Sequence, residues 1–594
     1  MLDPHLEYSN RLDFHLNMLS AKDRFHQNIG NAKLLLVVVG FVLTYLSFSK
    51  NFFPAFWLIV FIGIYLTLAL WHELILRAKT RAATAVDFYR KGIVRMEDRW
   101  EGTGQTGERF RTENHVYAED LDLFGKGSLF ELLSTARLPM GENRLADWLC
   151  RPSPKAVILA RQELVAELRQ KLDLRESLAL TGESLRVRLD PESLVGWAEQ
   201  APGMPGNVWR GLALALALAA AATGLYYLLS ATVWPFLLIL SLEALLRQRL
   251  RKRAGAVVEG VACNAEGLVL FASILDLLEK ESFALPQLQK LCAPLKEHPK
   301  PASQVIRSLA GIVYWIDARH SLLAHLADLP LLYTLQVGFA AEAWRRRWGA
   351  ALRAWVNMAA EMEALLSLAT YSFEHPADPF PDFVEDASGP FVGEALGHPL
   401  VPEKRCVRNS VRLNSEARVM LVSGSNMSGK STLLRTIGVN AVLAMAGAPI
   451  RGKSLRLSPM NIGTCIRRTD SLQQGRSGFY TEILQIHRVF QLTEDSVALL
   501  FLFDELLEGT NSKDRRIGAE GLLKGLLNRR AIGVVTTHDL ALTKIADSSQ
   551  GQIRNMHFED QVKDGKMHFD YKLREGVIAK SNALELMRLM GFEI

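Results

Sequence analysis

The stretch LALALALAAAATGLYYLL, residues 212–229, contains no charged side chain, and it belongs to a set of four apolar segments. The segments form two pairs, and each pair is joined by a turn of two or three residues. A hydrocarbon layer about 30 Å thick needs roughly 20 helical residues. A helix buried in a soluble core normally keeps a polar stripe, which these segments lack. We therefore predict two transmembrane helical hairpins, with arms at 34–48, 52–71, 211–230 and 233–246.

The residues that flank the hairpins indicate their orientation. Basic side chains precede and follow both pairs, most densely in RQRLRKR at 247–253. The positive-inside rule places such ends in the cytoplasm. We therefore expect a multi-pass protein of a bacterial-type inner (cytoplasmic) membrane, with its soluble domains facing the cytoplasm and no cleaved signal peptide. The alternative is a pair of buried hairpins in an all-α core, and the short first and fourth segments are the weakest part of the membrane interpretation.

The amino-acid composition excludes few classes of function. The 594 residues include 69 Lys and Arg against 63 Asp and Glu, a net charge of +6 that neither requires nor excludes a nucleic-acid partner. The five cysteines are scattered, with no CxxC motif and no histidine cluster at metal-ligand spacing. We therefore expect no structural metal and no disulfide framework.

From about residue 395 the pattern changes to short apolar runs that alternate with helical stretches. The runs ARVMLVSG, VALLFLFDE and AIGVVTTHD predict strands of a parallel sheet flanked by helices. The first run leads into GSNMSGKST, which fits the phosphate-loop pattern G-x-x-x-x-G-K-[ST] between a strand and a helix. Backbone amides of such a loop wrap phosphates, and the helix N-terminus adds positive potential. The predicted nucleotide-binding residues are Gly424, Ser425, Asn426, Met427, Ser428, Gly429, Lys430, Ser431 and Thr432.

Roles follow from the side-chain chemistry. ATP and Mg²⁺ are the expected cofactors: Lys430 would reach the β- and γ-phosphates, and Ser431 would ligate Mg²⁺. Asp504 ends the second apolar run and would hold Mg²⁺, while Glu505 would act as the general base. His538, at the end of the third run, would sense the γ-phosphate. The simpler alternatives are two acids that merely end a strand and a structural histidine.

These motifs resemble, in order, the ATPase domain of MutS-type DNA mismatch repair proteins. The resemblance lies in GSNMSGKSTLLRTIGVNAVLAMAGAPI, DSLQQGRSGFYTEI, FDELLEGTNSKDR and TTHDLALT. It implies an α/β ATPase domain of the ABC/MutS-like P-loop class at 395–594, working as a homodimer. It also implies that Asn426 reads the γ-phosphate, that Ser477 contacts the nucleotide of a partner subunit, and that Val407 packs on the adenine. AKSNALELMRLMGF resembles the closing helical segment of the family.

The resemblance extends upstream into an α-helical core and lever. DLFGKGSLFELLSTARLPMGENRLADWLCRP resembles the start of that core. No counterpart of the mismatch-reading, connector or Smr-type nuclease domains is recognised, and Glu508 stands where many relatives have arginine. The basic cluster Arg345–Arg347 could contact phosphates, but a solvated helix face is the favoured interpretation. The expected divisions are 1–85 with the first hairpin, 86–205, 206–253 with the second hairpin, 254–394 and 395–594.

The sequence thus predicts a membrane-anchored MutS-like ATPase whose levers transmit the closing and opening of composite dimer sites. Two functions of the ATP cycle remain open. The first is binding to mismatched or branched DNA, which the resemblance favours, although the second hairpin falls where the family's DNA clamp would be inserted. The second is a membrane mechanochemical or scaffold role without DNA. A solute exporter is disfavoured because the transporter signature LSGGQ has no counterpart.

Overall fold

A computed structural model describes residues 3–50, 56–112, 115–181, 190–261, 265–319, 328–386, 389–467, 478–495, 497–563 and 566–578. The chain divides into two compact units. The first contains residues 1–100 and 172–184, and the second contains 101–171 and 185–594. The first unit extends past the expected boundary at residue 85 because one unbroken helix continues to Met96.

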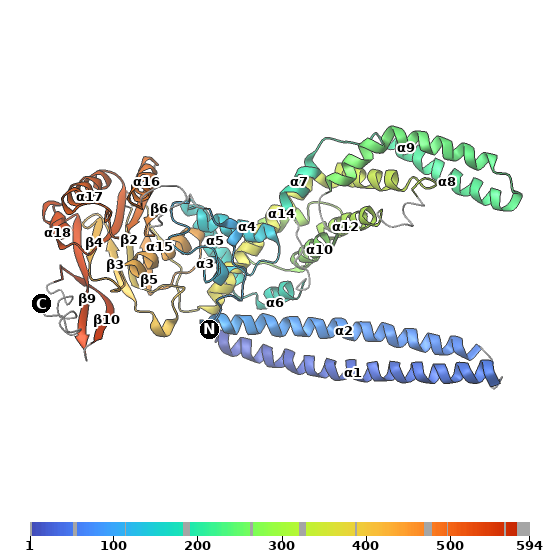
Figure 1. The fold of residues 1–594 in the computed structure, drawn as a ribbon, viewed down its shortest axis with the longest axis horizontal. Helices are drawn as coiled ribbons and strands as arrows, with labels where there is room; N and C mark the ends of the chain where they lie inside the picture. The colour runs from blue at the N-terminus through green and yellow to red at the C-terminus, as the bar shows by residue number, and fades with distance from the viewer. Residues whose placement is uncertain are drawn as a thin grey trace. The chain divides into compact units, whose positions relative to one another are not determined.

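Two long helices and one short helix build the first unit. Helices α1 (Pro4–Lys50) and α2 (Phe56–Met96) form an antiparallel pair, and α6 (Leu172–Leu180) packs on α2 (Figure 1). The first predicted arm and the described part of the second are the distal portions of these helices, and their large apolar side chains are exposed, among them Phe41 and Leu70. By length and composition, the stretches Pro4–Phe48 and Ile59–Met96 are each able to cross a membrane.

The opposite end of the same pair is polar and well packed. Arg11 of α1 binds Glu7 at 2.7 Å and Asp173 of α6 at 2.6 Å. The hydroxyl of Tyr89 donates to Glu176 at 2.5 Å, and the Tyr89 ring is fully buried. The hairpin therefore has an anchored polar base and, among its described residues, exposed apolar side chains at the other end.

Helices also form the first half of the second unit. Their buried faces meet on α14 (Tyr333–Glu374), which at 1.5 Å per residue is about 63 Å long. Helix α14 contacts α4, α5, α7, α9 and α12 along its length. The other helices of this region are α3 (Leu129–Leu133), α4 (Pro139–Cys150), α5 (Lys155–Leu168), α7 (Pro191–Glu199), α10 (Ala265–Lys280), α11 (Pro286–Cys292) and α12 (Ala302–Ala318), with 3₁₀ turns at Glu108–Phe110 and Ala293–Leu295.

The second predicted hairpin is α8 (Asn207–Ser230) and α9 (Trp234–Gly260), which pack against each other. Helix α8 is long and apolar enough to cross a membrane, whereas α9 qualifies only together with α10. Because α10 is buried against α12 in the helical region, only the apolar first half of α9 can serve as the returning arm. That half carries one acidic residue, Glu243.

The basic cluster Arg345–Arg347 lies on α14, and the structure contradicts its favoured interpretation as a solvated helix face. Arg345 is 5% exposed and pairs with buried Glu342 at 2.5 Å. Arg346 donates to Glu342 at 2.8 Å and to the carbonyl of Met204, so these arginines hold the loop that leads into α8. The prediction of a solvated face was wrong for Arg345, because helical spacing did not reveal that its neighbour Glu342 is itself buried. Arg347 is exposed.

Two sheets follow α14 in the second unit. A four-stranded sheet has the order β1-β5-β2-β3, and a six-stranded sheet has the order β10-β9-β4-β8-β7-β6. In the larger sheet every neighbouring pair is parallel except β9 and β10. The strands are β1 (Asp382–Phe383), β2 (Phe391–Leu396), β3 (Asn409–Leu413), β4 (Val419–Ser423), β5 (Ser454–Leu457), β6 (Met460–Cys465), β7 (Ala498–Phe503), β8 (Ala531–Thr537), β9 (Ile553–Lys563) and β10 (Lys566–Glu575).

Helices cover both faces of the larger sheet. Helices α16 (Gly478–Gln491) and α17 (Ser512–Leu527) share a buried cluster with Leu499, Phe501 and Phe503 of β7. Helix α15 (Lys430–Ala446) instead approaches Leu502. Because alternate residues of a strand face opposite sides, α15 lies on the other face. Shorter elements are α18 (Leu540–Thr543) and the 3₁₀ turns Glu403–Arg405, Leu492–Glu494 and Lys544–Ser548.

Candidate functional site

The centre of the site is the loop between β4 and α15. All five residues of β4 are buried, so the loop begins at the carboxyl edge of the sheet. Met427 and Gly429 have φ values of 69° and 102°, which turn the backbone sharply into the helix. A Cβ on Gly424 would lie 2.8 Å from the hydroxyl oxygen of Ser428, so a side chain there would displace Ser428. A tight loop that ends at a helix N-terminus is a favourable place for an anion.

Lys430 is folded back over this loop. Its ammonium donates to the carbonyls of Gly424 at 3.0 Å and Ser425 at 2.9 Å, and it lies 3.7 Å from a carboxylate oxygen of Glu505. Burial lowers the pKa of Lys430 below its usual value, and the nearby carboxylates of Glu505 and Asp504 oppose only part of that shift. The two carbonyl contacts hold the lysine nitrogen inside the loop, where a phosphate would need it.

Strand register brings Ser431 and Asp504 together. Ser423 of β4 is paired with Thr537 of β8, and Phe503 of β7 with Val535, so the ends of three strands lie at one edge. The hydroxyl of Ser431 donates to Asp504 Oδ2 at 2.5 Å. The hydroxyl of Thr536 donates to the other oxygen of the same carboxylate. Hydroxyl and carboxylate oxygens are the ligands that Mg²⁺ prefers.

A second group of side chains lies beside this edge. Glu505 has a φ of 50°, rare for a residue other than glycine, and its amide donates to Thr536 Oγ1 at 3.0 Å. His538 Nδ1 is 3.7 Å from Glu505 Oε1 and 3.9 Å from Glu508 Oε1. Arg515 of α17 holds the loop in place by donating to the Glu508 carbonyl at 2.9 Å. The structure thus brings the predicted base and the predicted histidine within reach of each other.

The loop opens into a cavity with a volume of about 990 Å³. Asn426, Met427 and Thr432 of the loop line it, together with Cys406 and Val407 from the segment before β3. These predicted residues therefore share one cavity with Gly429, Lys430, Ser431, Asp504 and Glu505. Ser477 and the closing segment 579–594 lie outside the described residues.

Several cavity residues were not predicted, and Tyr571 is the most informative. A register shift between Phe569 and Leu573 of β10 places Tyr571 in a left-handed conformation, with φ of 55°. Asn409 stabilises this bulge by donating to the Tyr571 carbonyl at 2.9 Å and accepting from the Leu573 amide at 2.8 Å. The Tyr571 ring then lies against Gly429. No sequence signal marks the bulge, because it depends on a distant strand.

His398 is another cavity residue that sequence reasoning missed. Burial, with a smaller effect from Arg435, lowers the pKa of His398 to about 4, so the ring is neutral near pH 7. Its Nδ1 accepts from the Leu400 amide at 3.2 Å. Asn440 of α15 fixes the preceding turn by donating to the Gly397 carbonyl at 2.9 Å. This wall of the cavity is thus tied directly to the helix that follows the phosphate loop.

The donor groups fit a magnesium-bound nucleoside triphosphate. In the described part of the chain, the hydroxyls of Ser425 and Ser428 are buried in the phosphate loop and have no hydrogen-bond partner. Lys430 supplies a cation beside them. Ser431 and Asp504 supply the oxygen pair for Mg²⁺. Phosphates, metal and a planar base would each find suitable groups within the same cavity.

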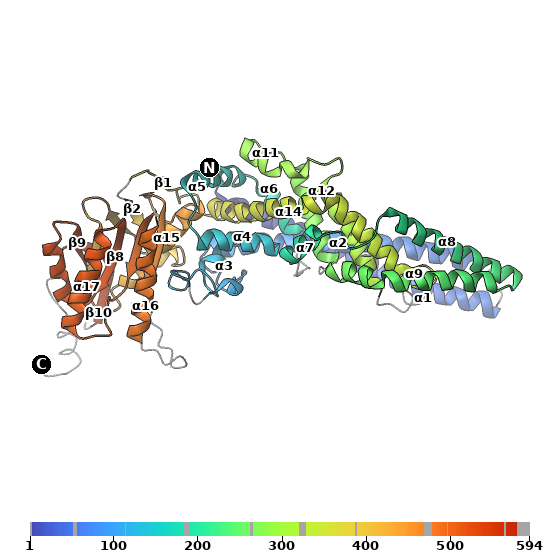
Figure 2. The same ribbon diagram turned by 90° about the horizontal axis from the view of Figure 1, so that it is seen from above.

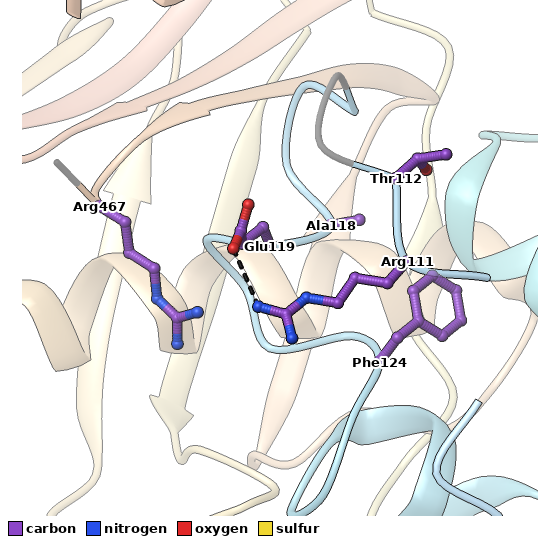
Figure 3. A pocket seen from close by; sticks show the side chains of 6 residues that line it. All are labelled: Arg111, Thr112, Ala118, Glu119, Phe124 and Arg467. Carbon is purple, nitrogen blue, oxygen red and sulfur yellow. Dashed lines mark hydrogen bonds and ion pairs between the residues drawn. The ribbon is translucent and has the colours of Figure 1, made fainter. Parts of the chain in front are cut away.

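The back of the site is joined to the helical region. Asp120 accepts from the Thr464 hydroxyl at 2.6 Å and from the amides of Ile466 and Arg467 at 2.9 Å. Next to this contact, Arg111 pairs with Glu119 at 3.0 Å while Arg467 lies on the other side of Glu119 (Figure 3). The hollow between them has a volume of only about 10 Å³, enough for about one water molecule. It is a junction rather than a ligand site.

Removing the Tyr571 ring should weaken nucleotide binding. We expect Tyr571→Ala to raise the Kd for a fluorescent ATP analogue by about fivefold or more, because Tyr571 lines the cavity and an aromatic ring that stacks on a nucleotide contributes on the order of 1–3 kcal/mol. Tyr314→Ala, at an exposed position on α12, is the matched control and should leave the Kd unchanged. Equal affinities for both variants would exclude Tyr571 from the binding site. Fluorescence titration of the detergent-solubilised protein measures both.

Comparisons with known proteins agree with this geometry. Residues 420–593 match the family described as MutS domain V. Over 248 residues the chain is 31% identical to the DNA mismatch repair protein MSH3 of Phaeosphaeria nodorum, covering 40% of this chain and 22% of that protein. It is 33% identical over 196 residues to the endonuclease MutS2 of Thermus thermophilus, covering 33% and 25%. It is 30% identical over 188 residues to the DNA mismatch repair protein MutS of Streptococcus uberis, covering 31% and 22%.

The chain therefore spans about a quarter of the length of these relatives. The matched family region includes most of β4, the phosphate loop, α15, both acids and His538. Together, the domain match and the three relatives support a MutS-like family for this chain, on the evidence of its C-terminal region.

Proposed function

We propose that this protein is a membrane-anchored, Mg²⁺-dependent ATPase that works as a homodimer and moves its second hairpin. The observation that carries the proposal is the convergence of Lys430, Ser431 and Asp504 on one large cavity at the carboxyl edge of the sheet. Edges of this kind are where open α/β sheets bind their ligands. The domain match supports the nucleotide part of the proposal.

Each residue has a chemical role in this proposal. Lys430 and the loop amides hold the phosphates, and Ser431 with Asp504 holds the metal. Bound Mg²⁺ would neutralise charge on the phosphates. Glu505, 3.7 Å from the lysine, is placed to accept a proton from the attacking water. His538, beside Glu505, would respond to the terminal phosphate.

The path from the site to the hairpin runs through α14. At its C-terminal end, the hydroxyl of Tyr371 is 3.5 Å from Asp378, which also pairs with Arg451 at 3.4 Å. The Arg451 amide donates to Asn440 of α15 at 2.8 Å. Further along α14, Glu342 and its arginines hold the loop before α8. Figure 2 shows α14 reaching from the side of α15 to α8 and α9. A rigid helix fixed at both ends can transmit a shift of α15.

Membrane anchoring is supported by the exposure of the apolar arms. Leu228, Leu229 and Trp234 at the tip of the second hairpin are each about three-quarters exposed or more. Exposed apolar surfaces of this extent mark interaction sites or a lipid environment. The basic ends of both hairpins favour the cytoplasmic side for the soluble parts.

The homodimer is proposed from the resemblance to MutS proteins. In that arrangement Ser477 of one subunit would complete the nucleotide site of the other. Met427 lines the cavity and is 86% exposed. A large apolar side chain at the mouth of a nucleotide cavity is well placed for burial by a partner.

Mutation of the nucleotide site should separate binding from hydrolysis. We expect Lys430→Ala to lose ATP binding and turnover, because the buried cation is removed. Glu505→Ala should still bind ATP but hydrolyse it at least about a hundredfold more slowly, as expected for loss of a general base. Glu520→Gln, at a partly exposed position on α17, is the control. Normal hydrolysis by either site variant would disprove the assigned roles, as measured by phosphate release and equilibrium binding.

DNA binding is the second candidate function, favoured by the names of two relatives as DNA mismatch repair proteins. The possibility that the cluster Arg345–Arg347 contacts DNA phosphates is weakened, because Arg345 forms an ion pair with Glu342. The first candidate function, movement of the second hairpin through α14, requires no DNA.

A DNA panel distinguishes the two candidates. Under the first, ATP turnover in lipid bilayers is unchanged by duplex, mismatched or branched DNA. Under the second, mismatched or branched DNA stimulates turnover several-fold, and the apparent affinity falls steeply between 50 and 200 mM salt because counterions are released. We expect DNA-indifferent and lipid-dependent turnover. Salt-sensitive stimulation by DNA would replace the first candidate with the second.

A further inference from the structure

Glu243 is the one acidic residue in the apolar half of α9, and it is completely buried. In the part of the chain that the structure describes, neither of its carboxylate oxygens has a hydrogen-bond partner. It lies on the same helical stripe as buried Leu246 and Leu250. The roles described above for the ATPase make no use of it.

The part of α8 that faces Glu243 carries no charge, and the one charged residue of that helix, Arg210, lies about two turns from Ala217. Helix α8 runs antiparallel to α9, with Gly224 beside Phe236, which places Glu243 near Ala217. The buried residues of α8 are the three alanines Ala213, Ala217 and Ala220. From 211 to 230 α8 carries no ionisable side chain other than its tyrosines. The alanine stripe therefore allows close approach of the two helices but offers no cation to the carboxylate.

The nearest basic residue on α9 is already engaged. Arg247 lies one turn beyond Glu243 and pairs with Asp328 at 2.5 Å. Helix α14 also packs on α9, where Gly338 meets Ala254, about three turns from Glu243. An ionised carboxylate buried without a partner costs several kcal/mol, and such a group takes up a proton instead. Ionisable residues within membrane segments are accordingly rare and functional.

We propose that Glu243 is a proton-binding site inside the second hairpin. The side chain is carried as a neutral carboxylic acid, and the bound proton keeps α8 packed on α9. Loss of the proton leaves a charge facing the alanine stripe, so the two arms separate to admit water. Because the stripe of Glu243 continues to the contact with α14, proton occupancy acts on the same element that the nucleotide site is proposed to move. This role adds to the proposed ATPase function and does not depend on hydrolysis.

Carbodiimide labelling tests the proton site directly. The full-length protein in lipid nanodiscs is treated with hydrophobic dicyclohexylcarbodiimide, which reacts with protonated carboxyls in apolar surroundings, and adducts are located by peptide mass spectrometry. We expect an adduct on Glu243 at pH 6 that falls at least tenfold at high pH. Exposed Glu259 on the same helix is the internal control for a water-soluble carbodiimide. No adduct on Glu243, labelling independent of pH, or equal labelling by the water-soluble reagent would each overturn the proposal.

A distance measurement tests the effect on packing. Spin labels are placed at Leu225 and Leu238, which are exposed on α8 and α9. The distance distribution should be narrow at pH 6 and broaden at pH 9 in the otherwise native protein. Glu243→Gln, which is neutral and similar in shape, should stay narrow at both pH values. Identical distributions at both pH values in the native background, or equal broadening in Glu243→Gln, would contradict the proposal.

Discussion

The shared edge of β4, β8 and β7 is the constraint on which the rest of the structure depends. Parallel pairing places the ends of these strands at one level, and Asp504 is held there by the hydroxyls of Ser431 and Thr536. The contact joins the first turn of α15 to the end of β7, which both acids follow directly. A shift of either strand by one residue would turn these side chains to the opposite face. The cavity, the buried lysine and the position of Glu505 all follow from this register.

A second constraint lies at the other end of α14. Glu342 and Arg345 form a buried ion pair, and exposed Arg346 joins Glu342 to the loop before α8. Breaking a buried ion pair by removal of one partner typically costs about 3–5 kcal/mol, so this group makes a stiff attachment. With Asn440 and Arg451 at the nucleotide end, α14 is held at both ends within one unit. This is the physical basis for coupling the site to the hairpin.

Features that depend on local chain order were predictable from sequence. The phosphate loop, the three strands around it and the helix that follows are determined by short-range patterns, and the structure contains them as β4, β7, β8 and α15. The apolar arms were recognisable for the same reason, although their helices are longer than the apolar segments. The predicted residues from Gly424 to Thr432 and the two acids converge because parallel strand ends must meet at one edge.

Features that depend on distant partners were not predictable. The bulge at Tyr571 is held by Asn409, 162 residues away. Arg345 looked exposed because its burial depends on the loop near Ala201. The boundary of the first unit depends on α6, which returns to α2 from residues 172–180. In each case the feature depends on a contact between segments that are far apart in the sequence, and local sequence patterns do not predict such contacts.

The central claim is that nucleotide binding is transmitted through α14 to the second hairpin. The most direct measurement uses an environment-sensitive fluorophore at Val208, an exposed position in the first turn of α8. In the Glu505→Ala background, ATP should change the emission. In the Glu342→Gln background, which loosens the attachment of α14, the change should be lost although ATP still binds. The account would be contradicted if ATP binding left the emission unchanged, or if the emission changed equally in the Glu342→Gln background.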